Sequence, residues 1–196
     1  MKAVTDYAVH NLIASRWSPY SFADRSLSDE DLRSLFEAAR WAASSYNEQP
    51  WSYIVAKKEE PNEFERLLSC LVEANQRWAK SASALALSIS RLNSHNNKPN
   101  RAAFHDLGLA AGNLVLEATA RGLAVHQMIG ILPDKARELY SIPDGYEPLT
   151  ALAIGYAGNP AELPEEIRAR DGARRPRKPL KEFVFAGQWG VAATLL

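Results

Sequence analysis

The segment 42–51, AASSYNEQPW, joins two predicted elements of the core. Before it, the capping-box pattern at 28–31 and the apolar residues that follow at helical spacing predict a helix over about 29–43. After it, residues 51–56 alternate and are β-prone, which predicts a strand. The segment itself carries two serines, an asparagine and a glutamine, with Glu48 as its only charge. A helix, an unusually polar turn and a strand therefore form the starting point of the fold.

The rest of the chain mixes helices and strands without a strict βαβ repeat, and this order favours an α+β sandwich over a doubly wound fold. The longest helical pattern covers 101–121 and includes Gly108 and Gly112. Each glycine weakens a helix interior by about 1 kcal/mol relative to alanine, so the pair predicts close packing against another helix or subunit. Other helices are expected from 61 to 72 and over 133–140, and strands over 84–89, 123–128 and 149–156.

Length and composition restrict the function classes. A chain of 196 residues with 46% hydrophobic residues predicts a single domain, 1–196, with an ordinary core. The 23 basic and 23 acidic residues balance, so no net charge favours nucleic acid or an anionic membrane. One cysteine, Cys70, fits a reducing compartment, and no apolar run is long enough for a signal peptide core or a membrane span. We expect a cytoplasmic protein with neither a nucleic-acid nor a membrane partner.

Arginines near both ends of the chain are candidates for binding a phosphate. Arg16 with Ser18 offers a guanidinium and a hydroxyl two residues apart, although an exposed loop arginine is the commoner explanation. Residues 174–178, RRPRK, form a second basic group within a Pro- and Arg-rich arm, about 160–196, that we expect to wrap over a neighbour. The basic group could bind RNA or be solvated, but it lacks aromatic residues for base stacking.

The polar turn has two interpretations. Ser44, Ser45, Asn47 and Gln49 supply hydrogen-bond donors and acceptors without charge, which suits the edge of a neutral heterocycle. They could equally form a local turn that only links helix to strand. The histidines lack metal-ligand spacing, so no metal site is expected. No Walker A or G-x-G-x-x-G motif occurs, so neither a P-loop ATPase nor a Rossmann NAD domain is supported.

Taken together, five segments resemble the FMN-dependent nitroreductase family in its own order along the chain. An N-terminal Arg-x-Ser-x-x-x-Phe is followed by the Ser-Ser-x-Asn-x-Gln-Pro-Trp turn, an Asn-x-x-Trp segment, a central helix and a C-terminal Arg-Lys-Pro. Two departures from the family pattern are Ala43, which replaces a proline, and Tyr20, which stands where a basic residue is frequent. The five segments are 16–22, 42–51, 73–78, 106–123 and 177–180.

The resemblance implies a three-layer sandwich of helices around a mostly antiparallel sheet, in a homodimer with FMN at the subunit interface. The C-terminal arm is then exchanged between subunits. Residues implied to contact FMN are Arg16, Trp17, Ser18, Asn75, Ile129, Gly130, Arg175 and Arg177, together with Ser44, Ser45, Asn47 and Gln49, which in this family often come from the other subunit.

The implied activity is ping-pong hydride transfer from NAD(P)H through flavin N5 to a quinone, nitroaromatic or related electrophilic acceptor. The cofactor carries this chemistry, so no catalytic acid or base is assigned. Dehalogenation or dehydrogenation on the same scaffold is one alternative. A non-catalytic nucleic-acid- or partner-binding protein that uses the Arg-rich tail is the other.

Overall fold

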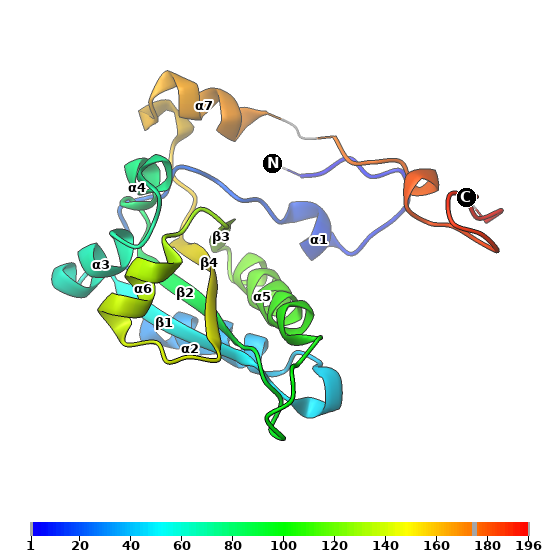
Figure 1. The fold of residues 1–196 in the computed structure, drawn as a ribbon. Coiled ribbons are helices and arrows are strands. Elements are labelled where there is room, and N and C mark those ends of the chain that lie inside the picture. The colour runs from blue at the N-terminus through cyan, green and yellow to red at the C-terminus, as the bar shows by residue number, and fades with distance from the viewer. Residues whose placement is uncertain (1, 174–175, 196) are drawn as a thin grey trace.

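A computed structural model describes residues 2–173 and 176–195. Its sheet has four strands in the order β1-β2-β4-β3, and every neighbouring pair is antiparallel. The strands are β1 (Trp51–Lys57), β2 (Ala84–Arg91), β3 (Ala124–Met128) and β4 (Tyr146–Gly155). The antiparallel sheet is flanked by helices on both faces, which confirms the predicted α+β sandwich (Figure 1).

Seven α-helices are described, and two core clusters assign most of them to a face of the sheet. Helices α2 and α5 share one cluster, and α3, α4 and α6 contribute to the other. The helices are α1 (Asn11–Ser15), α2 (Asp29–Arg40), α3 (Pro61–Leu68), α4 (Glu73–Ala79), α5 (Ala103–Ala120), α6 (Pro133–Tyr140) and α7 (Glu165–Gly172).

Strand β2 lies inside the sheet and is buried on both faces. Leu85 and Leu87 point into the cluster formed with α3 and α6, whereas Ala84 and Ala86 point toward α2 and α5. Successive side chains of a strand point to opposite faces, so this Ala/Leu alternation gives one face small residues and the other large ones. The small face lets α5 lie close to the sheet.

The helix predicted over 61–72 is interrupted, and α4 follows as a separate helix that the sequence did not reveal. Leu71 is fully buried and forms a β-bridge with Ile131, while the Val72 N–H donates to the Gly130 carbonyl at 3.1 Å. The chain therefore leaves the helix to pair with a distant segment. This pairing brings α4 against the residues that follow β3.

The strand register places two parts of the chain at opposite ends of the sheet. Trp51 pairs with Ser90 at one end of β1, and Lys57 pairs with Ala84 at the other. Seven residues at roughly 3.3 Å each put these ends about 20 Å apart. The 42–50 turn enters the sheet at the first end. The N-terminal loop joins the second end through a bridge between Phe22 and Ala157.

The C-terminal arm extends away from the sandwich, on the side where α1 lies (Figure 1). Phe183 and Trp189 in this arm are 55% and 89% exposed. Within the described part of the chain, no helix combines the length and apolar character that crossing a membrane requires.

Candidate functional site

The N-terminal loop places two cationic groups near one another. Arg16 is half-buried and donates from Nη1 to the Ser18 hydroxyl at 2.9 Å. Burial, and then the positive charge of Arg177, lower the pKa of the Arg16 guanidinium. Trp17 lies between Arg16 and Ser18 and is half-buried, while Arg175 lies outside the described residues.

The next residues fix this loop to three elements. The His126 Nδ1 atom of β3 lies 2.9 Å from the Pro19 carbonyl oxygen, and the Tyr20 N–H donates to the buried Asp171 carboxylate of α7 at 2.6 Å. The Tyr20 ring also packs against His126 and against Trp78 of α4, with centroid distances of 4.6 and 5.0 Å. The position of the Arg16 loop is therefore set by packing on α4, β3 and α7.

Asn75 and Gly130, which are distant in sequence, are in direct contact. The Asn75 Nδ2 group donates to the Gly130 carbonyl at 3.0 Å, next to the bond from Val72. A Cβ on residue 130 would lie 2.6 Å from Asn75 Nδ2 and 2.9 Å from Val72 Cγ2, so only glycine fits here. The neighbouring Ile129 is 75% exposed. Asn75 of α4 and Gly130, which were both predicted as site residues, thus lie side by side.

The polar turn has strained backbone conformations. Tyr46, Asn47 and Gln49 have φ values of 52°, 56° and 45°. Left-handed conformations cost a non-glycine residue about 1–2 kcal/mol each. Four hydrogen bonds lie within the turn. Two are between backbone groups, from Asn47 N–H to the Ser44 carbonyl and from Glu48 N–H to the Ser45 carbonyl; in the others the Gln49 N–H donates to the Ser44 hydroxyl at 3.1 Å and the Gln49 Nε2 group to the Asn47 carbonyl at 3.2 Å. Such strain persists only where surrounding contacts over-determine the backbone.

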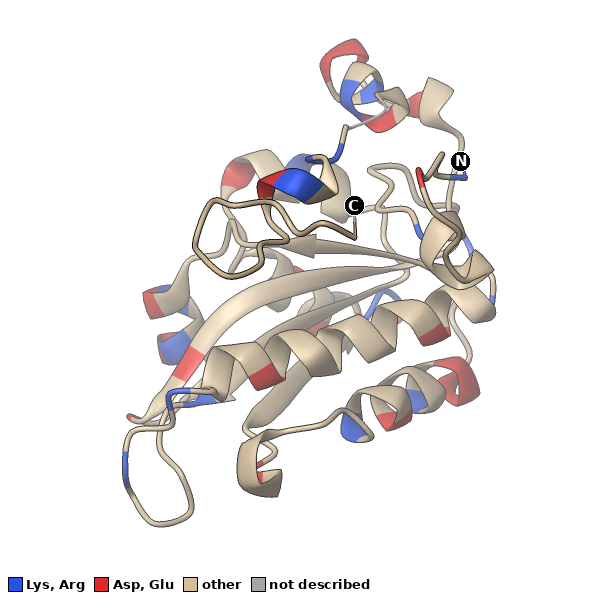
Figure 2. Cartoon of the chain, turned by 90° about the vertical axis from the view of Figure 1, so that its right-hand side faces the viewer, with Lys and Arg blue, Asp and Glu red and all other residues tan. Residues whose placement is uncertain are grey.

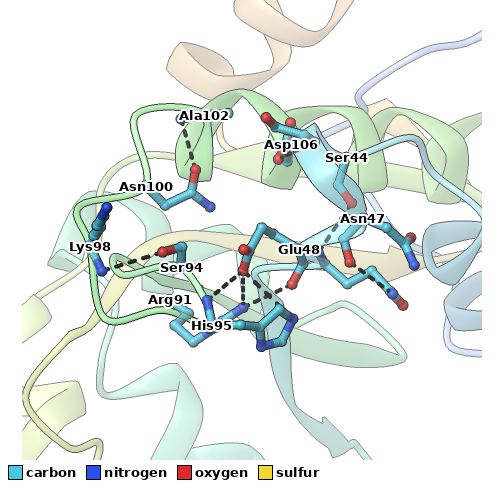
Figure 3. Close-up of polar contacts among 12 residues, drawn as sticks. Ser44, Asn47, Glu48, Arg91, Ser94, His95, Lys98, Asn100, Ala102 and Asp106 are labelled. Atoms are coloured by element: carbon cyan, nitrogen blue, oxygen red, sulfur yellow. Dashed lines mark hydrogen bonds and ion pairs between the residues drawn. The ribbon is translucent and has the colours of Figure 1, made fainter.

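Residues outside the predicted set brace this turn. Asp106 of α5 accepts the Ser45 N–H at 3.0 Å, and Glu48 accepts hydrogen bonds from Arg91 and from the His95 N–H (Figure 3). The sequence analysis did not assign a role to any of these side chains. One signal was available for Asp106, because it is the only charge between Arg101 and Glu117 except for a histidine neighbour.

One chain does not bring all of the predicted residues together. The 44–49 turn leads into β1, one edge strand of the sheet, and bonds to Asp106 of α5, whereas Gly130, with Asn75 bound to it, follows β3, the opposite edge strand. The loop of Arg16 and Ser18 is likewise fixed to β3, through the contact of Pro19 with His126. An open groove of about 850 Å³ lies between α2 and β1 and includes none of these side chains. This groove is therefore not formed by the predicted site residues.

A half-buried arginine beside a second arginine suits an anionic group, and a neutral amide-rich turn suits a heterocycle. On an antiparallel helix–sheet–helix sandwich, these features define a class of cofactor-binding α+β protein. The sequence profile of the nitroreductase family matches residues 13–156, so the chain belongs to the nitroreductase family. The predicted family is thereby confirmed.

Solved structures and a sequence relative agree with this assignment. The fold is similar to a crystal structure of an oxidoreductase containing FMN, with 34% identity, a TM-score of 0.90 and 95% of each chain covered. A nitroreductase family protein from Clostridium difficile 630 is 26% identical, with a TM-score of 0.67 over 90% of this chain and 96% of its own. A relative from Archaeoglobus fulgidus, provisionally named an NADH dehydrogenase/NAD(P)H nitroreductase, is 27% identical over 74% of this chain and 83% of its own.

The contact at Gly130 makes a testable prediction. Gly130→Ala should lower the free energy of unfolding by about 1–3 kcal/mol, because the added methyl group displaces Asn75 or Val72 from a packed contact. Chemical denaturation measures the change. Gly172→Ala is the matched control, since a Cβ there meets no atom within 4 Å and should leave stability unchanged or slightly higher. Equal stability of wild type and Gly130→Ala would contradict the close approach.

Proposed function

We propose that this protein is an FMN-dependent oxidoreductase that takes hydride from NAD(P)H and reduces quinones, nitroaromatics or related electrophilic acceptors. The observation that carries the proposal is the pairing of Arg16 with Arg177, because a buried guanidinium next to a like charge favours an anion between them. A phosphate accepts paired, charge-assisted hydrogen bonds from such groups, and Ser18 adds a hydroxyl.

The residues present fit the remainder of FMN as well. Bound FMN would supply two-electron hydride chemistry that no side chain provides. Asn75 presents an amide next to the Gly130 backbone, and the absence of a Cβ at residue 130 lets these two groups lie close together. The neutral groups of the 44–49 turn match the alternating carbonyl and N–H edge of a flavin. These residues bind and orient; none is assigned a proton transfer.

The relatives support the redox assignment and the electron donor. A structure that shares 34% identity over 95% of this chain is an oxidoreductase containing FMN, and the Archaeoglobus relative carries an NAD(P)H nitroreductase name. The choice of acceptor rests on family membership. The proposal includes a single FMN-binding domain over residues 1–196 and a cytoplasmic location. The free, buried Cys70 is consistent with a reducing compartment such as the cytoplasm.

A homodimer completes the site in this proposal. The two groups of predicted residues lie at opposite edges of one sheet, so a second copy is needed to place a 44–49 turn against the Arg16 loop. Helix α5 offers a surface for that copy. Its outward residues Phe104 and Leu109 are 48% and 40% exposed, and the helix facing the viewer in Figure 2 carries very few charges. The extended arm from about 160 would cross to the partner.

The reaction can be tested directly. We expect the purified protein to be yellow with a flavin spectrum, and NADH or NADPH to bleach it under anaerobic conditions. Steady-state rates with quinones, nitroaromatics and halogenated aromatics should give parallel double-reciprocal lines, as a ping-pong order requires. A colourless protein that stays colourless with added FMN would refute the proposal. If only halogenated aromatics are reduced, the proposed acceptor class would be wrong and the enzyme would be assigned to dehalogenation.

The phosphate role of the arginines makes a second test. Arg177→Ala should raise the Kd for FMN about tenfold or more, because a charge-assisted hydrogen bond is lost. Riboflavin lacks the phosphate, so its Kd should change less than about twofold by the same argument. Quenching of flavin fluorescence measures both values. Arg170→Ala, on the exposed face of α7, is the control. Equal weakening of FMN and riboflavin would rule out a phosphate contact.

The dimer is tested at Gly108. A Cβ at this position meets no atom of its own chain within 4 Å, and leucine is a better helix former than glycine, so Gly108→Leu should not destabilise the isolated protomer. It should block close packing of α5 against a second copy and yield monomers with weakened FMN binding. Analytical ultracentrifugation measures the mass. Glu65→Leu is the control for an added exposed leucine, since it places the same residue at an exposed position of α3. A dimer that survives Gly108→Leu would move the interface elsewhere.

A further inference from the structure

The 44–49 turn is strained in a way that its own hydrogen bonds do not explain. Three of its four residues from Tyr46 to Gln49 are left-handed without being glycine, and Tyr46 is 98% exposed. An exposed aromatic ring on a strained turn gains nothing from the packing of its own chain. The contacts that maintain this shape therefore come from beyond the turn.

The first brace is a buried carboxylate. Asp106 is only 2% exposed and lies in the first turn of α5, where the helix dipole favours a negative charge. Its Oδ2 atom accepts the Ser45 N–H at 3.0 Å across 61 residues of sequence. Burying a carboxylate is costly unless it forms hydrogen bonds. The Asp106 side chain therefore serves to hold the turn and contributes little apolar packing.

The second brace is Glu48, which acts at the other end of the turn. Its Oε2 atom accepts from Arg91 Nη2 at 2.8 Å and from the His95 N–H at 2.9 Å (Figure 3). The Arg91 Nη2 group also donates to the Glu48 carbonyl at 2.9 Å. The Glu48 and Arg91 side chains are 11% and 19% exposed, so this ion pair is largely shielded from solvent. The turn is thus tied to α5 on one side and to the end of β2 on the other.

We propose that Asp106 and Glu48 are positioning residues that hold the turn in its flavin-binding shape before the cofactor arrives. This inference rests on the proposed function, since it assigns the strained shape to FMN recognition. A turn that is already ordered does not have to be ordered on binding, and preorganisation of this kind raises affinity. Without a brace, the left-handed residues relax to ordinary conformations, and FMN must restore the strained shape.

A brace that serves only the fold would behave differently, and α5 provides the comparison. Asn113, two turns further along α5, donates from Nδ2 to the Ala38 carbonyl at 3.2 Å. Both Asp106 and Asn113 thus connect α5 to the backbone of the preceding segment, but only Asp106 contacts the turn. Asn113→Ala should lower stability without changing the turn.

The experiment compares Asp106→Ala, Asp106→Asn and Asn113→Ala. In the cofactor-free protein, hydrogen exchange of the Ser45 and Gln49 amides should accelerate at least tenfold in Asp106→Ala and stay near wild type in Asn113→Ala. The Kd for FMN should rise about tenfold in Asp106→Ala, the loss expected for one hydrogen bond to a charged group. Asp106→Asn keeps an acceptor oxygen and should restore most of both values. Glu48→Ala removes the acceptor of Arg91 and of the His95 N–H and should shift both values in the same direction as Asp106→Ala.

The outcomes separate this inference from the proposed function. If wild type binds no FMN, the proposed function fails, while the exchange rates still report whether Asp106 holds the turn. Unchanged exchange in Asp106→Ala, or an FMN Kd within twofold of wild type, would overturn the positioning role. An equal loss of FMN affinity in Asn113→Ala would show that Asp106 only stabilises the fold and does not position the turn for FMN. If Asp106→Ala does not fold, Glu48→Ala decides, and wild-type values in that variant would overturn the inference.

Discussion

The antiparallel ladder between β1 and β2 is the constraint on which the remaining arrangement depends. It fixes the start of β1 at one end of the sheet, and with it the polar turn that precedes Trp51. The same ladder starts β2 at the other end, where the N-terminal loop joins the sheet through Phe22. A strand cannot be shortened or slipped by one residue without exchanging its two faces. With β4 and β3 added beyond β2, the turn before β1 and the residues that follow β3 lie at opposite edges of the sheet, so neither set can move toward the other.

Local strain and tertiary bracing explain why the turn differs from an ordinary linker. From the residues alone, Ser44, Asn47 and Gln49 favoured a turn and a ligand site equally. The structure shows that part of their hydrogen-bonding capacity is used within the turn, as the alternative interpretation required. It also shows left-handed backbone that a mere linker has no need to adopt. The turn is therefore locally bonded, and its strain supports the proposed role in binding beyond connection.

Much of the fold was predictable because its signals are periodic. The helix at 133–140 and the two-sided burial of β2 follow from spacing and from alternating side chains. The break between α3 and α4 was not predictable, since Leu71 continues the helical stripe and leaves it only to pair with Ile131. Helix α7 was missed for the opposite reason, because its residues have almost no apolar stripe.

The residues of the candidate site also divide into those that the sequence revealed and those that only the structure revealed. Family motifs located Arg16, Asn75 and Gly130, and the structure supplied the contact between the last two. Asp106 and Glu48 escaped notice because a single sequence cannot show that a carboxylate at 106 reaches an amide 61 residues away. Residues that recognise a ligand tend to gather in short motifs, whereas residues that hold those motifs in place are scattered. Sequence reasoning therefore found the proposed contacts and missed their support.

Helix α5 connects these features. Gly108 and Gly112 suggested close packing, yet a Cβ at either position meets nothing within 4 Å in the chain itself. The glycines thus weaken the helix without any gain inside the protomer, and close packing against the proposed second copy would account for them. Asp106 lies one turn away on the buried side of the same helix. In the proposed dimer, one helix then places its own turn and meets the partner, so cofactor binding and association favour each other.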